Sequence, residues 1–165
     1  FHMCARTHED FFATDLISDI LSRGHSSRLN HSLVKEQKLF TNIDAFVGGS
    51  VDSGLFYFAG KLAPNITMQE AEKGIDAEIE KLKASLVADS ELRKVKNKVI
   101  SAQMFSELNV LNKAMNLATS ELIGDANLVN KQIDLYEAVT SDKIMTIAQD
   151  VFRNENSNTL YYLAK

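Results

Sequence analysis

Residues 26–42, SSRLNHSLVKEQKLFTN, read as a short helix that runs directly into a strand. Ser26 and Ser27 belong to the residue types that cap helix N-termini, so we expect one of them to be the N-cap. Leu29 and Leu33 recur at helical spacing and form an apolar face that ends near Gln37. This junction predicts a domain in which helices and strands pack together.

The junction leads into a predicted β-hairpin. Residues 39–47 and 55–62 are rich in β-branched and aromatic side chains that nearly alternate with polar ones. Between them, residues 48–53 (GGSVDS) supply the glycine, serine and aspartate that favour turns. We therefore expect two antiparallel strands here.

Helical periodicity dominates the rest of the chain. A helix is predicted over residues 9–23, where Gly24 ends it, and another over 68–86, which opens with the capping-box sequence TMQE at 67–70. With Asp89 as N-cap, a helix of more than 30 residues is predicted towards Ile123, and its length indicates a bend.

Two further helices and a strand complete the prediction. The helices cover residues 126–138 and 141–152, with Thr140 as the N-cap of the second. The last strand is NTLYYLA at 158–164. The element order predicts an α+β fold, a small, mainly antiparallel sheet covered on one face by helices, in a single domain spanning residues 1–165.

The chain opens at Phe1 without an initiator methionine, and its first six residues, FHMCAR, resemble the end of a strand. We therefore expect a fragment of a longer protein, truncated in its first strand.

Composition limits the partners. A formal charge of −4, with both signs mixed along the chain, gives no basic surface for nucleic acid. No apolar run approaches the roughly 20 residues of a membrane span, so no membrane partner is expected. The single cysteine, Cys4, leaves the compartment open between a bacterial cell envelope, periplasm and cytoplasm.

Few residues suggest chemistry. The four histidines are scattered without a His-x-x-Glu-His motif or its reverse, so neither metal ligands nor catalytic residues are predicted. Cys4 has no Cys-x-x-Cys partner and is predicted to be a buried, unreactive thiol. The charged segments 72–83 and 91–98 are predicted to be solvated helix faces.

The predicted long helix carries two further patterns. Asn109, Asn112 and Asn116 recur at spacings of three and four, which is compatible with plain exposure or with a polar inner face that lines a cleft. The apolar side chains on this helix are predicted to belong to the core: Met104, Phe105, Met115 and Leu117.

One resemblance narrows the function. Gly24-His-Ser-Ser-Arg-Leu, followed by Leu33, Leu39 and a strand-turn-strand that ends in Asp-x-Gly-Leu-Phe at 52–56, resembles the insulinase/pitrilysin family of zinc peptidases. That family includes the mitochondrial processing peptidases, and the likeness extends over nearly the whole chain. The positions of the family motif in this sequence are Ser27, Arg28, Leu29 and Gly54, to which the resemblance assigns a structural role.

The resemblance implies paired α+β domains. In the family, the first domain binds zinc through an inverted His-x-x-Glu-His motif, and the second lacks the ligands and closes over the first around an extended peptide. This sequence resembles the second, C-terminal domain, so zinc is expected in the parent protein's other domain and no cofactor in this segment. The implied partners are a zinc-bearing domain of the same chain or of a partner subunit, and a peptide substrate, which Asn109, Asn112 and Asn116 would face or contact. A homodimer of the isolated chain is a further expectation.

The sequence departs from the family pattern at two positions. Catalytic members tend to carry an Arg and a Tyr where this chain has Val34 and Thr41, so no catalytic residue is assigned. Three interpretations stay open. The parent is an active zinc endopeptidase, or a family member without peptidase activity that acts as a structural or partner subunit, or the chain is an unrelated α+β binding module.

Overall fold

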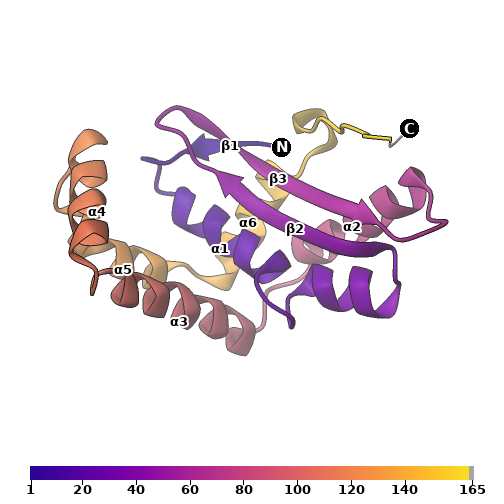
Figure 1. Cartoon of the computed structure of the whole chain (residues 1–165), viewed down its shortest axis with the longest axis horizontal. Coiled ribbons are helices and arrows are strands. Elements are labelled where there is room, and N and C mark those ends of the chain that lie inside the picture. The colour runs from indigo at the N-terminus through magenta and orange to yellow at the C-terminus, as the bar shows by residue number, and fades with distance from the viewer. Residues whose placement is uncertain (164–165) are drawn as a thin grey trace.

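The computed structural model describes residues 1–163 and contains a small antiparallel sheet with helices on one of its faces (Figure 1). The strands are β1 (His2–Ala5), β2 (Phe40–Gly48) and β3 (Ser53–Leu62), in the spatial order β1-β3-β2. The predicted hairpin is β2–β3, in which Phe46 lies opposite Tyr57. The α+β prediction is therefore confirmed.

Helix α1 (Phe11–Ser22) forms the centre of the domain. Its residues Leu16, Ile17, Ile20 and Leu21 are 0–1% exposed, and it packs mainly against β2. The same core contains Phe56 of β3, which is 1% exposed. A helix that is apolar almost all round is stable only when other elements cover it, and the remaining helices do so.

Helices α2 (Met68–Ala84) and α6 (Ser141–Val151) cover the core on the side of α1 away from α4 (Figure 1). The predicted capping box is present in α2, where the Thr67 hydroxyl accepts from the Glu70 N–H and the Glu70 carboxylate accepts from the Thr67 N–H. The predicted Thr140 cap is also present, because its hydroxyl accepts from the Lys143 N–H.

The predicted long helix is two helices, α3 (Asp89–Ser106) and α4 (Val110–Leu122). The chain breaks at Asn109, whose side-chain oxygen accepts from the N–H groups of Leu111 and Asn112 and so starts a new helix. Ala88 rather than the predicted Asp89 occupies the N-cap position of α3. Helix α5 (Leu128–Ala138) then returns the chain to α6 (Figure 1).

The predicted final strand is wrong for residues 158–163, which form no strand; Ala164 lies outside the described residues. A 3₁₀ turn (Asn154–Asn156) precedes this tail. Two side chains then tie the tail to α2, because the hydroxyls of Thr159 and Tyr161 donate to the carboxylate of Glu72. These polar contacts hold the segment along a helix rather than along a strand.

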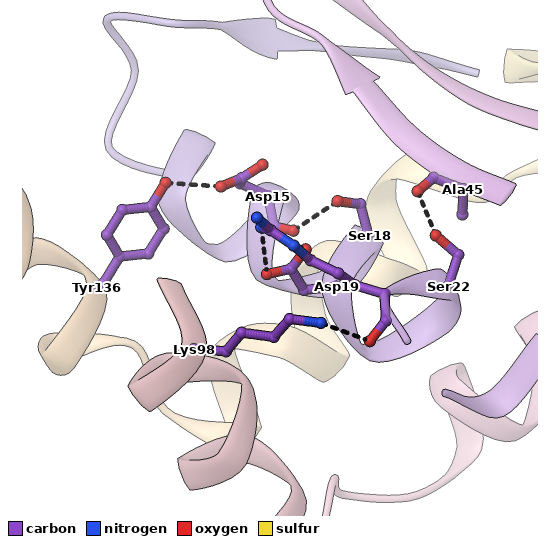
Figure 2. A network of polar contacts seen from close by, with 8 residues as sticks. Asp15, Ser18, Asp19, Ser22, Ala45, Lys98 and Tyr136 are labelled. Atoms are coloured by element: carbon purple, nitrogen blue, oxygen red, sulfur yellow. Dashed lines mark hydrogen bonds and ion pairs between the residues drawn. The ribbon is translucent and has the colours of Figure 1, made fainter. Parts of the chain in front are cut away.

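Polar side chains of α1 are each paired within the packed layers (Figure 2). The Tyr136 hydroxyl of α5 donates to Asp15 Oδ2 at 2.6 Å, and the Ser22 hydroxyl donates to the Ala45 carbonyl of β2 at 2.7 Å. Since buried polar groups without partners are destabilising, these bonds allow a polar helix face to lie inside the domain.

The second half of this network centres on Asp19. The Arg23 guanidinium donates to both oxygens of Asp19 at 3.1 Å, and Lys98 of α3 donates to the Arg23 carbonyl at 3.2 Å (Figure 2). Burial raises the pKa of both Asp15 and Asp19 because it disfavours the charged form. Helices α3 and α5 are thus joined to α1 through ionisable groups.

The substitution Asp15→Asn tests this network by its pH dependence. The folded-state pKa of Asp15 lies above its unfolded-state value. Protonation of Asp15 therefore favours folding, and this contribution is lost as the pH rises through the folded-state pKa. Asparagine keeps an acceptor for Tyr136 without a buried charge. We expect the variant to be at least as stable as the wild type at neutral pH, with an advantage that shrinks on acidification, measured by urea unfolding.

The matched control is Asp134→Asn, which removes an exposed carboxylate from α5. It should leave the urea midpoint nearly unchanged at both pH values. A loss of stability in Asp15→Asn that is equal at neutral and acidic pH would contradict the expectation.

Candidate functional site: the helix-to-strand junction and the open sheet face

The junction that begins at Ser26 contains the predicted short helix, which is a π-helix, η1 (Asn30–Glu36). Its wider turn is visible in the bond from the Gln37 N–H to the Ser32 carbonyl, five residues back, at 2.9 Å. Leu29 and Leu33 are both 0% exposed and anchor this segment in the core. Both leucines, four residues apart, therefore point inward before β2 begins.

The predicted serine cap is wrong. The Ser27 side chain is buried, and its hydroxyl donates to the Gly24 carbonyl at 2.7 Å instead of accepting from a helical N–H. Gly24 has a φ of +101°, which turns the chain back so that its carbonyl lies within reach of Ser27. Ser26 accepts a bond from Lys94 of α3. The two serines therefore stabilise the loop before the helix.

Arg28 joins the junction to α3. Its Nε and Nη2 donate to the two carboxylate oxygens of Glu91 at 3.1 and 2.7 Å, a paired geometry that holds both planes fixed. Only 20% of the Arg28 side chain and 22% of the Glu91 side chain is exposed. This ion pair links positions 63 residues apart in the chain.

Gly54 lies where the start of β3 passes the end of β2. A Cβ atom at this position would be 2.7 Å from the Gly48 carbonyl oxygen, which is backbone and cannot rotate away. Any side chain there would push the two strands apart, so glycine lets the hairpin close.

The two departures from the family pattern lie on this junction and on β2. Val34 is half-buried in η1 and packs against the core. Thr41 is exposed on β2, and its hydroxyl donates to the Lys61 carbonyl of β3 at 3.1 Å. Val34 offers no polar group, and the hydroxyl of Thr41 is used within the hairpin.

The face of the sheet opposite α1 carries a feature that we did not single out from the sequence. Phe46 of β2 and Tyr57 of β3 stack with ring centroids 5.1 Å apart and an interplanar angle of 17°. They remain 46% and 41% exposed. The signal was present in the alternation of the hairpin, because one face of each strand had to point away from the core.

A shallow hollow of about 330 Å³ lies between η1 and α2. It is lined by Ser26, Arg28, His31, Ser32, Glu36, Glu78 and Lys81. The expectation that residues 72–83 form a solvated face is wrong at Glu78, which is 3% exposed and accepts from Lys81 at 2.6 Å. At the wall of the hollow, Arg28 is paired with Glu91, and Glu78 is paired with Lys81.

The predicted asparagine positions lie on or beside α4, away from the sheet. Asn109 is its N-cap, Asn112 is exposed and Asn116 is half-buried. The predicted core assignment of this region is wrong, because its apolar side chains are exposed: Met104 by 61%, Phe105 by 71%, Met115 by 59% and Leu117 by 50%. The break at Asn109 separates α4 from α3 and leaves this face uncovered.

The residues present do not fit a zinc ion. Among residues 1–163, no group of three or more His, Cys, Asp or Glu side chains is placed to hold a metal. Burial raises the pKa of the Cys4 thiol, which disfavours the thiolate that metals require. Within the same residues, no helix combines the length and apolarity that crossing a bilayer requires.

Comparison with known proteins decides the family. The model described as the peptidase M16 inactive domain matches residues 1–99. The chain belongs to the peptidase M16 inactive-domain family. The resemblance inferred from the junction is thereby confirmed.

One curated relative is a longer protein. This M16 inactive domain is 27% identical over 156 residues to the zinc protease PqqE of Helicobacter pylori, in a match that covers 93% of this chain and 35% of that protein. The chain therefore spans about a third of the length of this curated relative.

Two solved structures share its fold at 26% identity. A proposed zinc protease from Bordetella pertussis Tohama I superimposes with a TM-score of 0.84, over 94% of this chain and 86% of that one. The inactive peptidase domain of a proposed zinc protease from Bordetella parapertussis gives a TM-score of 0.81, over 90% of this chain and 79% of that one. These likenesses agree with the assignment of an inactive domain.

A double-mutant cycle on Arg28 and Glu91 tests how much their ion pair stabilises the junction. We expect Arg28→Ala to lower the free energy of unfolding by about 2 kcal/mol, because charge-assisted hydrogen bonds contribute roughly 1.5–3 kcal/mol. The coupling energy with Glu91→Ala should exceed about 1 kcal/mol by chemical denaturation.

The control cycle uses Glu80 and Lys83, a pair three residues apart on α2 whose carboxylate side is 65% exposed. Exposed pairs of this kind couple by about 0.3–0.5 kcal/mol. Equal coupling in the two cycles would rule out a special role for Arg28.

Proposed function

We propose that this chain is the non-catalytic domain of a zinc metalloendopeptidase and that it closes over a separate zinc-bearing domain around a peptide substrate. The observation that carries this proposal is the match to the M16 inactive domain in a chain that spans about a third of a relative named as a zinc protease. The zinc and the water that it activates then belong to the other domain or subunit. This chain contributes an enclosing wall.

The open face of the sheet is the surface that we assign to the peptide chamber. Phe46 and Tyr57 present a stacked aromatic platform there, and the helices occupy the opposite face. Aromatic rings bind apolar peptide side chains without needing charge. We assign Asn109, Asn112 and Asn116 no part in this face, because they lie on or beside α4.

Peptide contact with this face is favoured over strand addition to β2. Phe1 and Phe56 exchange backbone hydrogen bonds across β1 and β3, so alternation directs the backbone groups of Ala45 to the outer edge of β2. The Ala45 carbonyl already accepts from Ser22 of α1. An incoming strand would have to share that carbonyl with Ser22, whose side chain lies against the edge.

A second candidate function is a structural or partner subunit of a family member without peptidase activity. The observation that favours it is the pair Val34 and Thr41, which supply neither the charge nor the reach of the Arg and Tyr that catalytic relatives tend to carry. The zinc motif of the parent protein separates the two candidates.

The isolated chain should bind no stoichiometric zinc and cleave no peptide. Metal analysis after dialysis and a fluorogenic peptide assay measure both. One tightly bound zinc per chain would overturn the domain assignment. The purified parent protein should contain an inverted His-x-x-Glu-His motif and zinc, and the lack of both would leave only the structural-subunit function.

In an active parent, the double substitution Phe46→Ser and Tyr57→Ser should raise KM several-fold and leave kcat nearly unchanged. The reason is that an aromatic wall binds the substrate and the transition state about equally. Steady-state kinetics measure the split. The control is Val51→Ser, an exposed apolar side chain in the turn between the strands. An unchanged KM would show that the open face of the sheet does not contact the peptide substrate.

A further inference from the structure

Helix α4 is packed with its polar side towards the domain and its apolar side towards water. Ser120 is buried and Asn116 is half-buried, whereas Leu111, Met115 and Leu122 are 66%, 59% and 81% exposed. With Ala118, these last residues recur at spacings of four, three and four and form one stripe along the helix. A helix normally buries its apolar stripe, so this one lacks a partner.

The stripe continues across the break into α3. The additional exposed apolar side chains are Met104 at 61%, Phe105 at 71%, Leu108 at 79%, Val110 at 84% and Leu117 at 50%. No charged side chain interrupts the stripe of α4 itself. Figure 1 shows α4 projecting from the end of the helical layer, where a second molecule can reach it.

We propose that a second copy of this chain covers this surface, in a two-fold symmetric dimer in which the two α4 helices pack antiparallel. Reversing the direction of α4 maps its stripe onto itself. Leu111 then meets the partner's Leu122, and Met115 meets the partner's Ala118, a large side chain against a small one. A surface that is complementary to its own copy is what a two-fold interface requires.

The exposed apolar area is a large part of what a dimer interface needs. Burial of a large apolar side chain removes about 60–120 Å² from water at about 25 cal/mol per Å², so the eight side chains, 50–84% exposed, offer on the order of 300–650 Å² per copy. Standard interfaces bury about 800 Å² per partner, so the apolar side chains account for part of such an interface and the flanks of the helices would have to supply the remainder.

The flanks introduce no repulsion. In the antiparallel arrangement Asn112 lies beside the partner's Thr119, and Ala114 lies beside the partner's Glu121. No like charges are opposed at these positions, because the charged Glu121 faces Ala114, so the apolar stripe determines the pairing. The open sheet face lies on another side of the domain, so this dimer is independent of the peptide-chamber proposal.

Sedimentation velocity on the 165-residue chain tests the proposal. We expect a concentration-dependent dimer, and Met115→Lys should give a monomer at the same concentration with an unchanged circular dichroism spectrum. Val51→Lys places the same charge on an exposed apolar position of the β2–β3 turn and should remain dimeric. A monomeric wild type, or a dimer that persists in Met115→Lys, would overturn the proposal.

A charge-exchange experiment tests the antiparallel register. The double variant N112E/T119E and the double variant N112K/T119K should each be monomeric, because like charges oppose each other across the two-fold axis. An equimolar mixture should restore a dimer that contains one of each, since opposite charges then meet. If the mixture stays monomeric, the proposed pairing is wrong.

Discussion

The burial of α1 against β2 and β3 is the packing interaction on which the other elements depend. Ten of its twelve residues are buried, so almost no side of this helix faces water. The apolar side packs on the sheet, and helices α3, α5 and α6 cover the other sides. Among the polar side chains of α1, Asp15 accepts from Tyr136 of α5, whereas Ser18 bonds within α1 and Asp19 pairs with Arg23 directly after it. The helical layer is therefore arranged around the needs of one helix.

The same constraint explains the form of the junction. After α1 ends at Ser22, the chain must turn and enter β2 at Phe40. Gly24 turns it, Ser27 closes the turn, and the π-helix places Leu29 and Leu33 in the core. The pair of Arg28 and Glu91 then fixes the junction to α3. Packing and charge pairing thus act on one short segment, which is why its residue types are so specific.

Sequence patterns predicted most of the fold because local rules determined those elements. The hairpin, the capping box at Thr67 and the cap at Thr140 depend on residues close in the chain. The failures had two causes. The hydroxyl of Ser27 donates to a nearby carbonyl instead of accepting from a helical N–H, and the tail pairs with Glu72, which is distant in the chain, instead of joining a strand edge.

The sequence predicted a bend before α4 but not two separate helices. Its residues continue the helical period of α3, so periodicity alone predicts one bent helix with an inward apolar face. The cap formed by Asn109 starts a new axis, and the direction of that axis depends on contacts with α5. The stacked pair of Phe46 and Tyr57 was missed for a related reason, since alternation shows which side chains share a face and not that the face stays open.

The side chains of Val34 and Thr41 limit the chemistry that this domain can contribute. A lost hydrogen-bond donor to a developing oxyanion typically costs about 2.7–4 kcal/mol in kcat, and neither side chain can supply one here. Under the proposed function, apolar contacts of Phe46 and Tyr57 would bind substrate and transition state alike, so they would act on KM. Under the proposed function, Val34 and Thr41 would therefore contribute no selective stabilisation of the transition state, and the zinc-bearing domain would supply the zinc chemistry.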